Sequence, residues 1–258
     1  MGNNNLLENG LADRKREKKI SYWLIGISGF FLFSFFIVPY TVPTNSVPEL
    51  SGRANYIDYM NEGSWGNIQT REGGHVGHNQ EEHGGTFSWS ELNPYSALIY
   101  GFGDLNCHQK HDRTWSLNGN QMPVCVRDVG IFFGFFLGSI IWNRKGLNRW
   151  TITDSIISVY PSTLYDSIYI RGRRSIAVWL FAAIAIIPMG LDGGIQAISS
   201  YESNSFMRLF TGIPFGLFIG LFFSSSISAR PKYFSDDPSK VLLPLGARLT
   251  KEFSSESE

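Results

Sequence analysis

Four apolar stretches, separated by polar segments, run along this chain. The first covers residues 20–40, contains no charged side chain, and is long enough to cross a hydrocarbon core of about 30 Å as a helix. Three more follow at residues 129–142, 176–189 and 206–223. The second and third stretches are shorter than the roughly 20 residues that a crossing needs, so we expect flanking residues to extend them. Their uniform apolarity and their Phe, Gly and Trp content favour membrane spans over buried helices of a soluble domain.

The basic residues give these spans an orientation. They cluster before the first span, between the second and third, and after the fourth, so four spans place sixteen of the 22 Lys and Arg residues on one side. The positive-inside rule makes that side cytoplasmic, and both termini with it. No small-x-small cleavage site follows the first span, so we expect an uncleaved anchor rather than a signal peptide. The sequence therefore predicts a multi-pass protein of the cell membrane, in contact with the lipid bilayer.

The predicted fold is all-α, a polytopic integral membrane protein with about four transmembrane helices. Its expected parts are a basic cytoplasmic tail (1–19), a transmembrane anchor (20–40), a His- and Gly-rich, largely irregular extracytoplasmic loop (41–93), a membrane domain with three further spans (94–228) and a cytoplasmic tail (229–258). Residues 93–105 suit a short helix on or in the outer leaflet, and residues 149–171 suit an interfacial helix. The net charge is zero and topology accounts for the basic clusters, so nucleic acid is not an expected partner.

Glycines spaced four residues apart line the second and fourth predicted spans. They are Gly130, Gly134, Gly138, Gly212, Gly216 and Gly220. Each set falls on one helix face and allows another backbone to approach closely. Two interpretations stay open: ordinary helix packing, or a face that holds a site or docks a partner, either another membrane protein or a second copy. Pro188 and Gly190 are expected to end the third span, and Pro214 to kink the fourth.

Ionisable residues gather at the predicted outer ends of the spans. They are Arg127, Asp128, Asp192 and Arg208, with the amide of Gln196 beside them. Ionisable groups at membrane depth are costly, and they are usually paired or functional. One interpretation pairs one of the two aspartates with one of the two arginines. The other places all four at the level of the lipid headgroups, where a charge costs little.

All five histidines and both cysteines fall between residues 75 and 125. Three interpretations compete for the cysteines. A disulfide between Cys107 and Cys125 suits an oxidising outer face and closes a loop of about 18 residues, worth about 3 kcal/mol through the entropy of the unfolded chain. A zinc site is the second, with Cys107, His108, Cys125 and Asp128 as four ligands of suitable type. A thiol redox site is the third, and it lacks a Cys-x-x-Cys motif.

Three further histidines, His75, His78 and His83, lie in the segment GGHVGHNQEEHGG. Short His-rich tracts bind divalent metal loosely, whereas the glycines favour a solvated loop. A loop that binds metal would deliver the ion to the region of residues 107–128. His111 fits no position that we can assign.

The segment CHQKHDRTWSLNGNQMPVCVRDVG has a more specific pattern: CHQ, an arginine, and G-x-Q-x-P-V-C-x-R-x-x-G leading into a glycine-spaced span. With D-x-x-x-Q from Asp192 and N-x-x-x-R-x-x-T-G from Asn204, it resembles, over residues 95–223, the predicted microbial membrane proteins grouped as domain of unknown function 2085. The resemblance implies a polytopic membrane protein and assigns no activity. It marks a polar or ligand site at Gln109, Arg113, Gln121, Asp192, Gln196 and Arg208. It also favours metal at the cysteines, although the further cysteine of the family pattern is Asp128 here.

No enzyme motif occurs in the sequence: there is no Walker A, G-x-S-x-G, H-E-x-x-H or dinucleotide fingerprint. The function we expect is an integral membrane protein whose extracytoplasmic Cys/His/Asp site binds a metal ion, zinc, or a small ligand. One alternative is a membrane-embedded enzyme for a lipid or quinone-like substrate, with Asp192, His108 and Arg208 as acid, base and anion clamp. Another is a structural subunit of a membrane complex with a Cys107–Cys125 disulfide.

Overall fold

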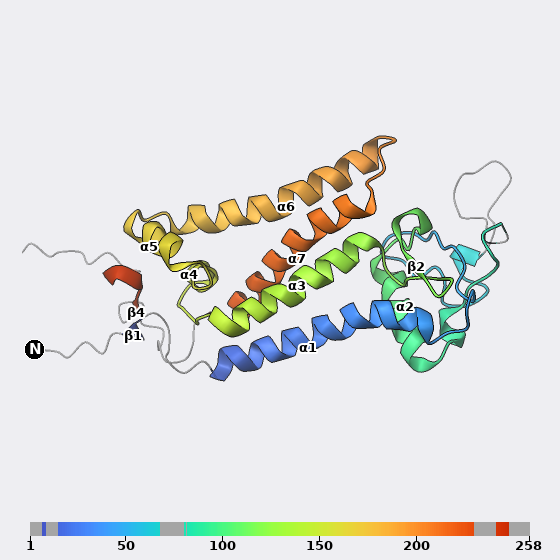
Figure 1. Cartoon of the computed structure of the whole chain (residues 1–258), viewed down its shortest axis with the longest axis horizontal. Helices are drawn as coiled ribbons and strands as arrows, with labels where there is room; N and C mark the ends of the chain where they lie inside the picture. The colour runs from blue at the N-terminus through green and yellow to red at the C-terminus, as the bar shows by residue number, and fades with distance from the viewer. Residues whose placement is uncertain (1–6, 9–14, 68–79, 81, 230–240, 248–258) are drawn as a thin grey trace, which may run out of the picture. The chain divides into compact units, whose positions relative to one another are not determined.

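The computed structural model describes residues 7–8, 15–67, 80, 82–229 and 241–247, and these are mostly helical (Figure 1). The helices are α1 (Lys15–Ile37), α2 (Pro94–Asn106), α3 (Val126–Lys145), α4 (Ile152–Ile157), α5 (Ser162–Ile170), α6 (Arg174–Ile198) and α7 (Ser205–Ser228). Two short strand pairs accompany them: β1 (Leu7–Glu8) runs parallel to β4 (Val241–Leu242), and β2 (Ser116–Leu117) antiparallel to β3 (Asn120–Gln121). Single 3-10 turns lie at Val38–Tyr40, Trp65–Asn67, Trp89–Glu91, His111–Arg113 and Pro244–Gly246.

Among the described residues, four helices are long and apolar enough to cross a membrane: α1, α3, α6 and α7. The predicted all-α class with four spans is therefore confirmed. The expected extension of the second span is present, because α3 begins at Val126. The predicted end of the third span was wrong, because α6 runs through Pro188 and Gly190 to Ile198. A proline removes only one backbone hydrogen bond from such a helix, and the rest of the ladder supports the turns that follow.

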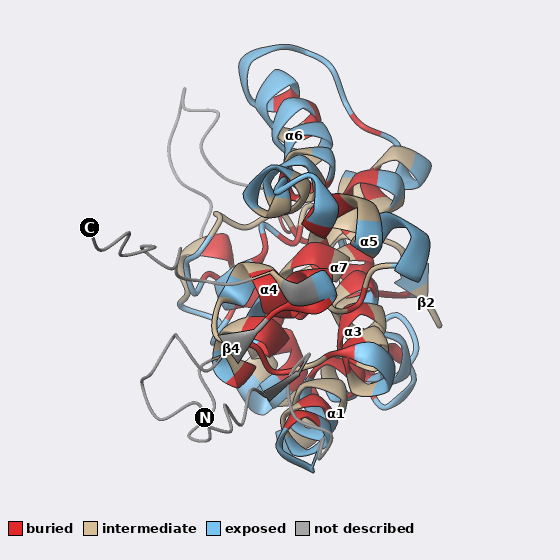
Figure 2. Ribbon diagram, turned by 90° about the vertical axis from the view of Figure 1, so that its left-hand side faces the viewer, coloured by how far each residue is buried: buried red, intermediate tan, exposed pale blue. Residues whose placement is uncertain are grey.

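Much of the apolar surface of these helices is exposed. On α6, the side chains of Ile176, Trp179, Ile184 and Ile198 are all more than half exposed, and most of the visible surface of this helix has the colour of exposed residues in Figure 2. A helix of a water-soluble protein turns such side chains toward a core. Large apolar side chains on the outside of long helices instead suit contact with lipid tails.

The chain divides into two compact units. We call residues 27–133 and 189–213 the loop-bearing unit, and residues 1–26, 134–188 and 214–258 the tail-bearing unit. The predicted interfacial helix at 149–171 belongs to the tail-bearing unit and consists of two helices, α4 and α5. Pro161 directly precedes α5, and a residue before proline is disfavoured in the helical conformation. This proline accounts for the interruption.

In the tail-bearing unit, α3 and α7 pack closely. The fully buried Trp142 of α3 belongs to the same apolar cluster as Leu221 of α7. A Cβ atom added at Gly138 would lie 2.6 Å from the carbonyl oxygen of Leu217, so only glycine permits this approach. Four of the six spaced glycines, Gly130, Gly138, Gly212 and Gly220, thus lie close to the backbone of the other helix.

Aromatic side chains form the apolar interior of the loop-bearing unit. Phe31 and Phe35 of α1 pack against Phe102 of α2 and Phe132 of α3, with ring centroids 4.3–6.1 Å apart. The short helix predicted at 93–105 is α2, whose N-cap Asn93 accepts a hydrogen bond from the backbone N–H of Ser96 over 3.0 Å. These contacts position the C-terminal end of α2 and the N-terminal end of α3, where the candidate site lies.

Buried polar side chains hold the irregular loop that precedes α2. Asp104, which is 1% exposed, accepts hydrogen bonds from the backbone N–H groups of Asp58 and Tyr59 and from the indole of Trp89. Asn120 accepts two further loop N–H groups, each over 2.8 Å. Irregular backbone needs such partners because it lacks the regular ladder of a helix or sheet.

Candidate metal centre

Three potential metal ligands meet where α2 ends and α3 begins. Cys107 follows α2, Cys125 directly precedes α3, and Asp128 lies in the first turn of α3. One ligand atom from each, two sulfurs and a carboxylate oxygen, lie within 4.8 Å of one another. The backbone N–H of Cys125 donates to the sulfur of Cys107 over 3.3 Å, and the Cys125 thiol donates to Asp128 over 3.4 Å. The structure thus brings together three of the four ligands proposed from the sequence for zinc.

The surroundings of Cys107 suit a cation. Its hydrogen bond with Cys125, its burial and the nearby charge of Asp128 all hold the pKa of the Cys107 thiol well above its ordinary value. A bound dication would counteract these effects and favour the thiolate, because metals bind thiols in their deprotonated form. The N-terminal end of α3 adds the positive end of a helix dipole at the same place.

Both cysteines are free thiols in the structure, so the predicted disulfide is not confirmed. The fourth predicted ligand, His108, lines the adjoining cavity but does not belong to the group of three converging atoms. Partial burial and the positive charges of Arg113 and Lys110 lower the pKa of His108. Its imidazole is therefore neutral near pH 7, which is the form that binds metals.

The amides of Gln109 and Gln121, two residues marked by the family pattern, hold the backbone around the cysteines. Gln109 donates to the carbonyl oxygen of Pro123 over 2.9 Å, and Gln121 donates to the carbonyl oxygen of Gln109. Gln121 also accepts from the backbone N–H of Leu50 over 2.7 Å. Both glutamines are buried and link the segment after Cys107 to the segment before Cys125. They therefore position the two thiols.

A cavity of about 260 Å³ adjoins the cysteines. Its lining includes four cationic side chains, those of Lys110, Arg113, Arg127 and Arg208. Arg127 forms an ion pair with Asp192, and the hydroxyl of Tyr201 donates to the same carboxylate over 3.2 Å. Of the aspartate–arginine pairs considered from the sequence, the structure shows Asp192 with Arg127.

Glu202, which the sequence analysis did not select, connects three residues that it did. Arg113 donates to its carboxylate over 2.6 Å, Arg208 donates over 3.3 Å, and the amide of Gln196 also donates to it. Although partial burial raises the pKa of Glu202, the hydrogen bond and charge of Arg113, with smaller effects of Lys110 and Gln196, lower it overall. The only hint in the sequence is that Glu202 is, with Asp192, one of two acidic residues between the apolar stretches at 176–189 and 206–223.

Of the three histidines that the sequence places in one loop, the structure describes only His83. His75 and His78 lie outside the described residues. His83 lies beside His111, which the sequence left unassigned, and beside Glu49. This second group also belongs to the loop-bearing unit.

Comparison with known proteins matches part of the chain to a family of predicted membrane proteins. Residues 107–222 match the family model described as "Predicted membrane protein (DUF2085)". An uncharacterized protein of Methanothermobacter thermautotrophicus is 31% identical over 111 residues, which cover 43% of this chain and 78% of that protein. The chain belongs to the DUF2085 family. A second relative, an uncharacterized protein of Methanocaldococcus jannaschii, is 30% identical over 118 residues, which cover 45% of this chain and 60% of that protein. No solved structure matches the chain.

Membership of the DUF2085 family makes this chain a multi-pass membrane protein in contact with the lipid bilayer. The matched region begins at Cys107 and includes Cys125, Asp128 and every residue that lines the cavity. Glu49 and His83 lie outside the matched region.

Proposed function

We propose that this membrane protein binds a divalent metal ion, zinc, through Cys107, Cys125 and Asp128. The convergence of their ligand atoms within 4.8 Å carries the proposal. Thiolate and carboxylate are good zinc ligands, and three protein ligands leave a fourth position for water, a substrate or another side chain. His108, which lines the adjoining cavity, is the candidate side chain for that position.

Metal analysis of the purified full-length protein tests the proposal. We expect the zinc content per chain to fall by one equivalent in Cys107→Ser, in Cys125→Ser and in Asp128→Asn. Asp166→Asn is the matched control, because Asp166 is an exposed carboxylate outside the group. Loading with cobalt adds a spectroscopic check, since a cysteine-bound cobalt ion gives thiolate-to-metal charge-transfer absorption. His108→Ala tests the fourth position. If this variant binds zinc more weakly than the wild type, His108 is the fourth ligand.

The competing outcome is a structural disulfide. If alkylation under denaturing conditions labels neither cysteine until a reductant is added, and no metal is found, the metal site is wrong. The chain then fits a structural subunit of a membrane complex stabilised by a Cys107–Cys125 bond.

The cationic cavity favours a second ligand, an anionic group. Lys110, Arg113, Arg127 and Arg208 line one small cavity beside the metal ligands. Arginine side chains bind phosphate and carboxylate groups through two parallel hydrogen bonds. The buried Nε atoms of Arg113 and Arg127 have no hydrogen-bond partner among the described residues. An anion in this cavity would supply the missing acceptor and would lie next to the open metal position.

Titration with inorganic phosphate, followed by calorimetry, tests the anion proposal. We expect binding that weakens by about tenfold in Arg208→Ala and Arg127→Ala. Copurified anionic lipid identified by mass spectrometry would indicate a headgroup as the ligand, and phosphate binding without lipid would indicate a free anion. Absence of both would contradict an anion site and remove support for the lipid-directed enzyme.

We also propose an orientation of the chain in the membrane. Sixteen basic residues flank the tail-side ends of the spans, which favours cytoplasmic termini and an extracytoplasmic metal centre. A cysteine added after Glu258 in a Cys107→Ser/Cys125→Ser background should react with a membrane-impermeant thiol reagent only after the cells are lysed. Labelling of intact cells would reverse the orientation.

A further inference from the structure

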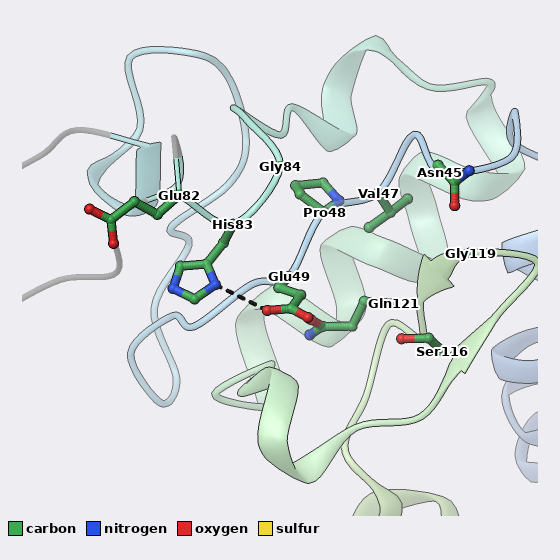
Figure 3. A pocket seen from close by; sticks show the side chains of 10 residues that line it. All are labelled: Asn45, Val47, Pro48, Glu49, Glu82, His83, Gly84, Ser116, Gly119 and Gln121. Carbon is green, nitrogen blue, oxygen red and sulfur yellow. Dashed lines mark hydrogen bonds and ion pairs between the residues drawn. The ribbon is translucent and has the colours of Figure 1, made fainter.

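We infer that Glu49, His83 and His111 form a second divalent-metal site, separate from the cysteine site. The three side chains come from three distant segments of the loop-bearing unit, and one ligand atom of each lies within 4.8 Å of the other two. The Nδ1 atom of His83 is 3.0 Å from a carboxylate oxygen of Glu49, and the Nε2 atom of His111 is 3.8 Å from the same oxygen. Figure 3 shows the ring of His83 turned toward Glu49.

Backbone hydrogen bonds bring these segments together. The N–H of Glu49 donates to the carbonyl oxygen of His83 over 3.1 Å, and the N–H of His111 donates to the carbonyl oxygen of Leu50 over 2.9 Å. The three side chains therefore face one another because their backbones are joined, before any metal binds. A site held in this way needs little reorganisation to accept an ion.

The turn that carries His83 is also fixed locally. The backbone N–H groups of His83 and Gly85 both donate to the carbonyl oxygen of Gln80, and the Gln80 amide donates to the carbonyl oxygen of Gly85. Gly84 and Gly85 have φ values of 103° and 100°, which favour glycine. This turn gives His83 a defined position in a segment whose composition indicates only a flexible loop.

The donor set is the chemical basis of the inference. Two imidazoles and one carboxylate bind zinc, nickel, cobalt and copper(II), and they form the three-ligand set of several zinc sites that keep an open position. The imidazole rings are 5.2 Å apart at an angle of 39°, so they are not stacked face to face. Asp112, whose carboxylate lies 2.9 Å from Nε2 of His111, provides a further oxygen at the site.

Exposure and charge indicate how the site would work. Glu49 is 57% exposed, and the two histidine side chains are about one-third exposed, so the ion would keep contact with water. Lys110, whose ammonium lies 3.4 Å from Asp112, is a nearby positive charge that weakens binding of a cation. The site also borders a cavity of about 350 Å³ lined by Glu49, Glu82 and His83. In Figure 3, Glu82 points away from Glu49, so we do not count it as a ligand. These features suit an accessible site with weaker binding than the buried cysteine site.

The closing experiment keeps the two sites distinguishable. Calorimetric titration of Zn²⁺ into full-length Cys107→Ser/Cys125→Ser protein in detergent should show one remaining binding event. That event should weaken by about tenfold or more in His83→Ala, in His111→Ala and in Glu49→Gln. Glu62→Gln is the matched control for Glu49→Gln, because it removes an exposed carboxylate outside the group and should leave the titration unchanged.

Equal zinc affinity in the parent and the two histidine variants would overturn the inference and leave only a hydrogen-bonded histidine–carboxylate contact. If the double cysteine variant does not fold, cobalt spectra of otherwise wild-type protein replace it. His83→Ala and His111→Ala should then lose one equivalent of cobalt and keep the thiolate-to-cobalt absorption. The thiolate-to-cobalt absorption should be lost only in the cysteine variants, and that loss reports on the cysteine site. The two proposed sites can therefore be confirmed or contradicted independently.

Discussion

The guanidinium of Arg113 lies 2.6 Å from a carboxylate oxygen of Glu202, a residue 89 positions later in the chain. This contact joins the segment after Cys107 to the connection between α6 and α7. Arg208, whose side chain is only 3% exposed, shares the same carboxylate. Glu202 therefore offsets two of the positive charges that line the cavity, and it sets how strongly that cavity attracts an anion.

Replacing Glu202 with glutamine should separate the contribution of Glu202 to stability from its effect on anion binding. We expect Glu202→Gln to unfold more easily by roughly 1–2 kcal/mol, because buried Arg208 loses its charged partner, although the exposure of Glu202 limits the loss. The same variant should bind inorganic phosphate more tightly, because Arg113 and Arg208 are released. Thermal melting and phosphate titration measure the two outcomes. Glu91→Gln, at an exposed position, is the control. Weaker phosphate binding in Glu202→Gln would contradict an anion role for the cavity.

The contribution of Glu202 to stability should depend on pH. The pKa of Glu202 is lowered in the folded protein from its ordinary value of 4.5, so its stabilisation is present above that value and is lost as the pH falls through the folded pKa. The difference in melting temperature between wild type and Glu202→Gln should be constant near neutral pH and shrink in acid. A difference that stays constant into strong acid would show that the carboxylate charge is not responsible.

Hydropathy predicted the four long helices because a membrane span requires an apolar run of nearly fixed length. It did not predict where α6 ends. Proline and glycine are reliable helix breakers in water, but α6 continues for ten residues after Pro188 and carries Asp192 and Gln196 on its last turns. The break between α4 and α5 was also missed, although Pro161 marks it.

The cysteine–aspartate group was predictable because its spacing is a local pattern that resembles a family motif. The partners of the charged residues were not, because tertiary packing decides them. Sequence proximity grouped His83 with His75 and His78, whereas backbone hydrogen bonds between distant segments place His83 with His111 and Glu49. Gln109 and Gln121 stand in the motif beside the cysteines, and sequence gives no sign that their amides bind backbone instead of a ligand.

Gly103 should be essential for the metal centre. A Cβ atom at this position would lie 1.8 Å from the carbonyl oxygen of Pro123, two residues before Cys125. Gly103→Ala must therefore displace α2 or the segment that carries Cys125, and we expect a loss of stability of about 1–3 kcal/mol together with loss of zinc. Gly26→Ala, where an added Cβ meets nothing within 4 Å, is the control and should retain both. Melting curves and metal analysis measure the outcome, and wild-type zinc content in Gly103→Ala would show that the segment tolerates the shift.

Two of the close approaches between α3 and α7 should have different consequences. A Cβ atom at Gly212 would lie 2.7 Å from the carbonyl oxygen of Arg127, whereas one at Gly138 would lie 2.6 Å from that of Leu217. Both substitutions to alanine should destabilise the protein by about 1–3 kcal/mol, because the opposing atoms are backbone and cannot rotate away. Only Gly212→Ala moves the helix turn that carries Arg127 and Asp128, so only this variant should also weaken zinc and phosphate binding. Thermal melting, zinc analysis and phosphate titration of the two variants measure this contrast. Equal loss of ligand binding in both would mean that the site responds to general destabilisation and not to the local position of α3.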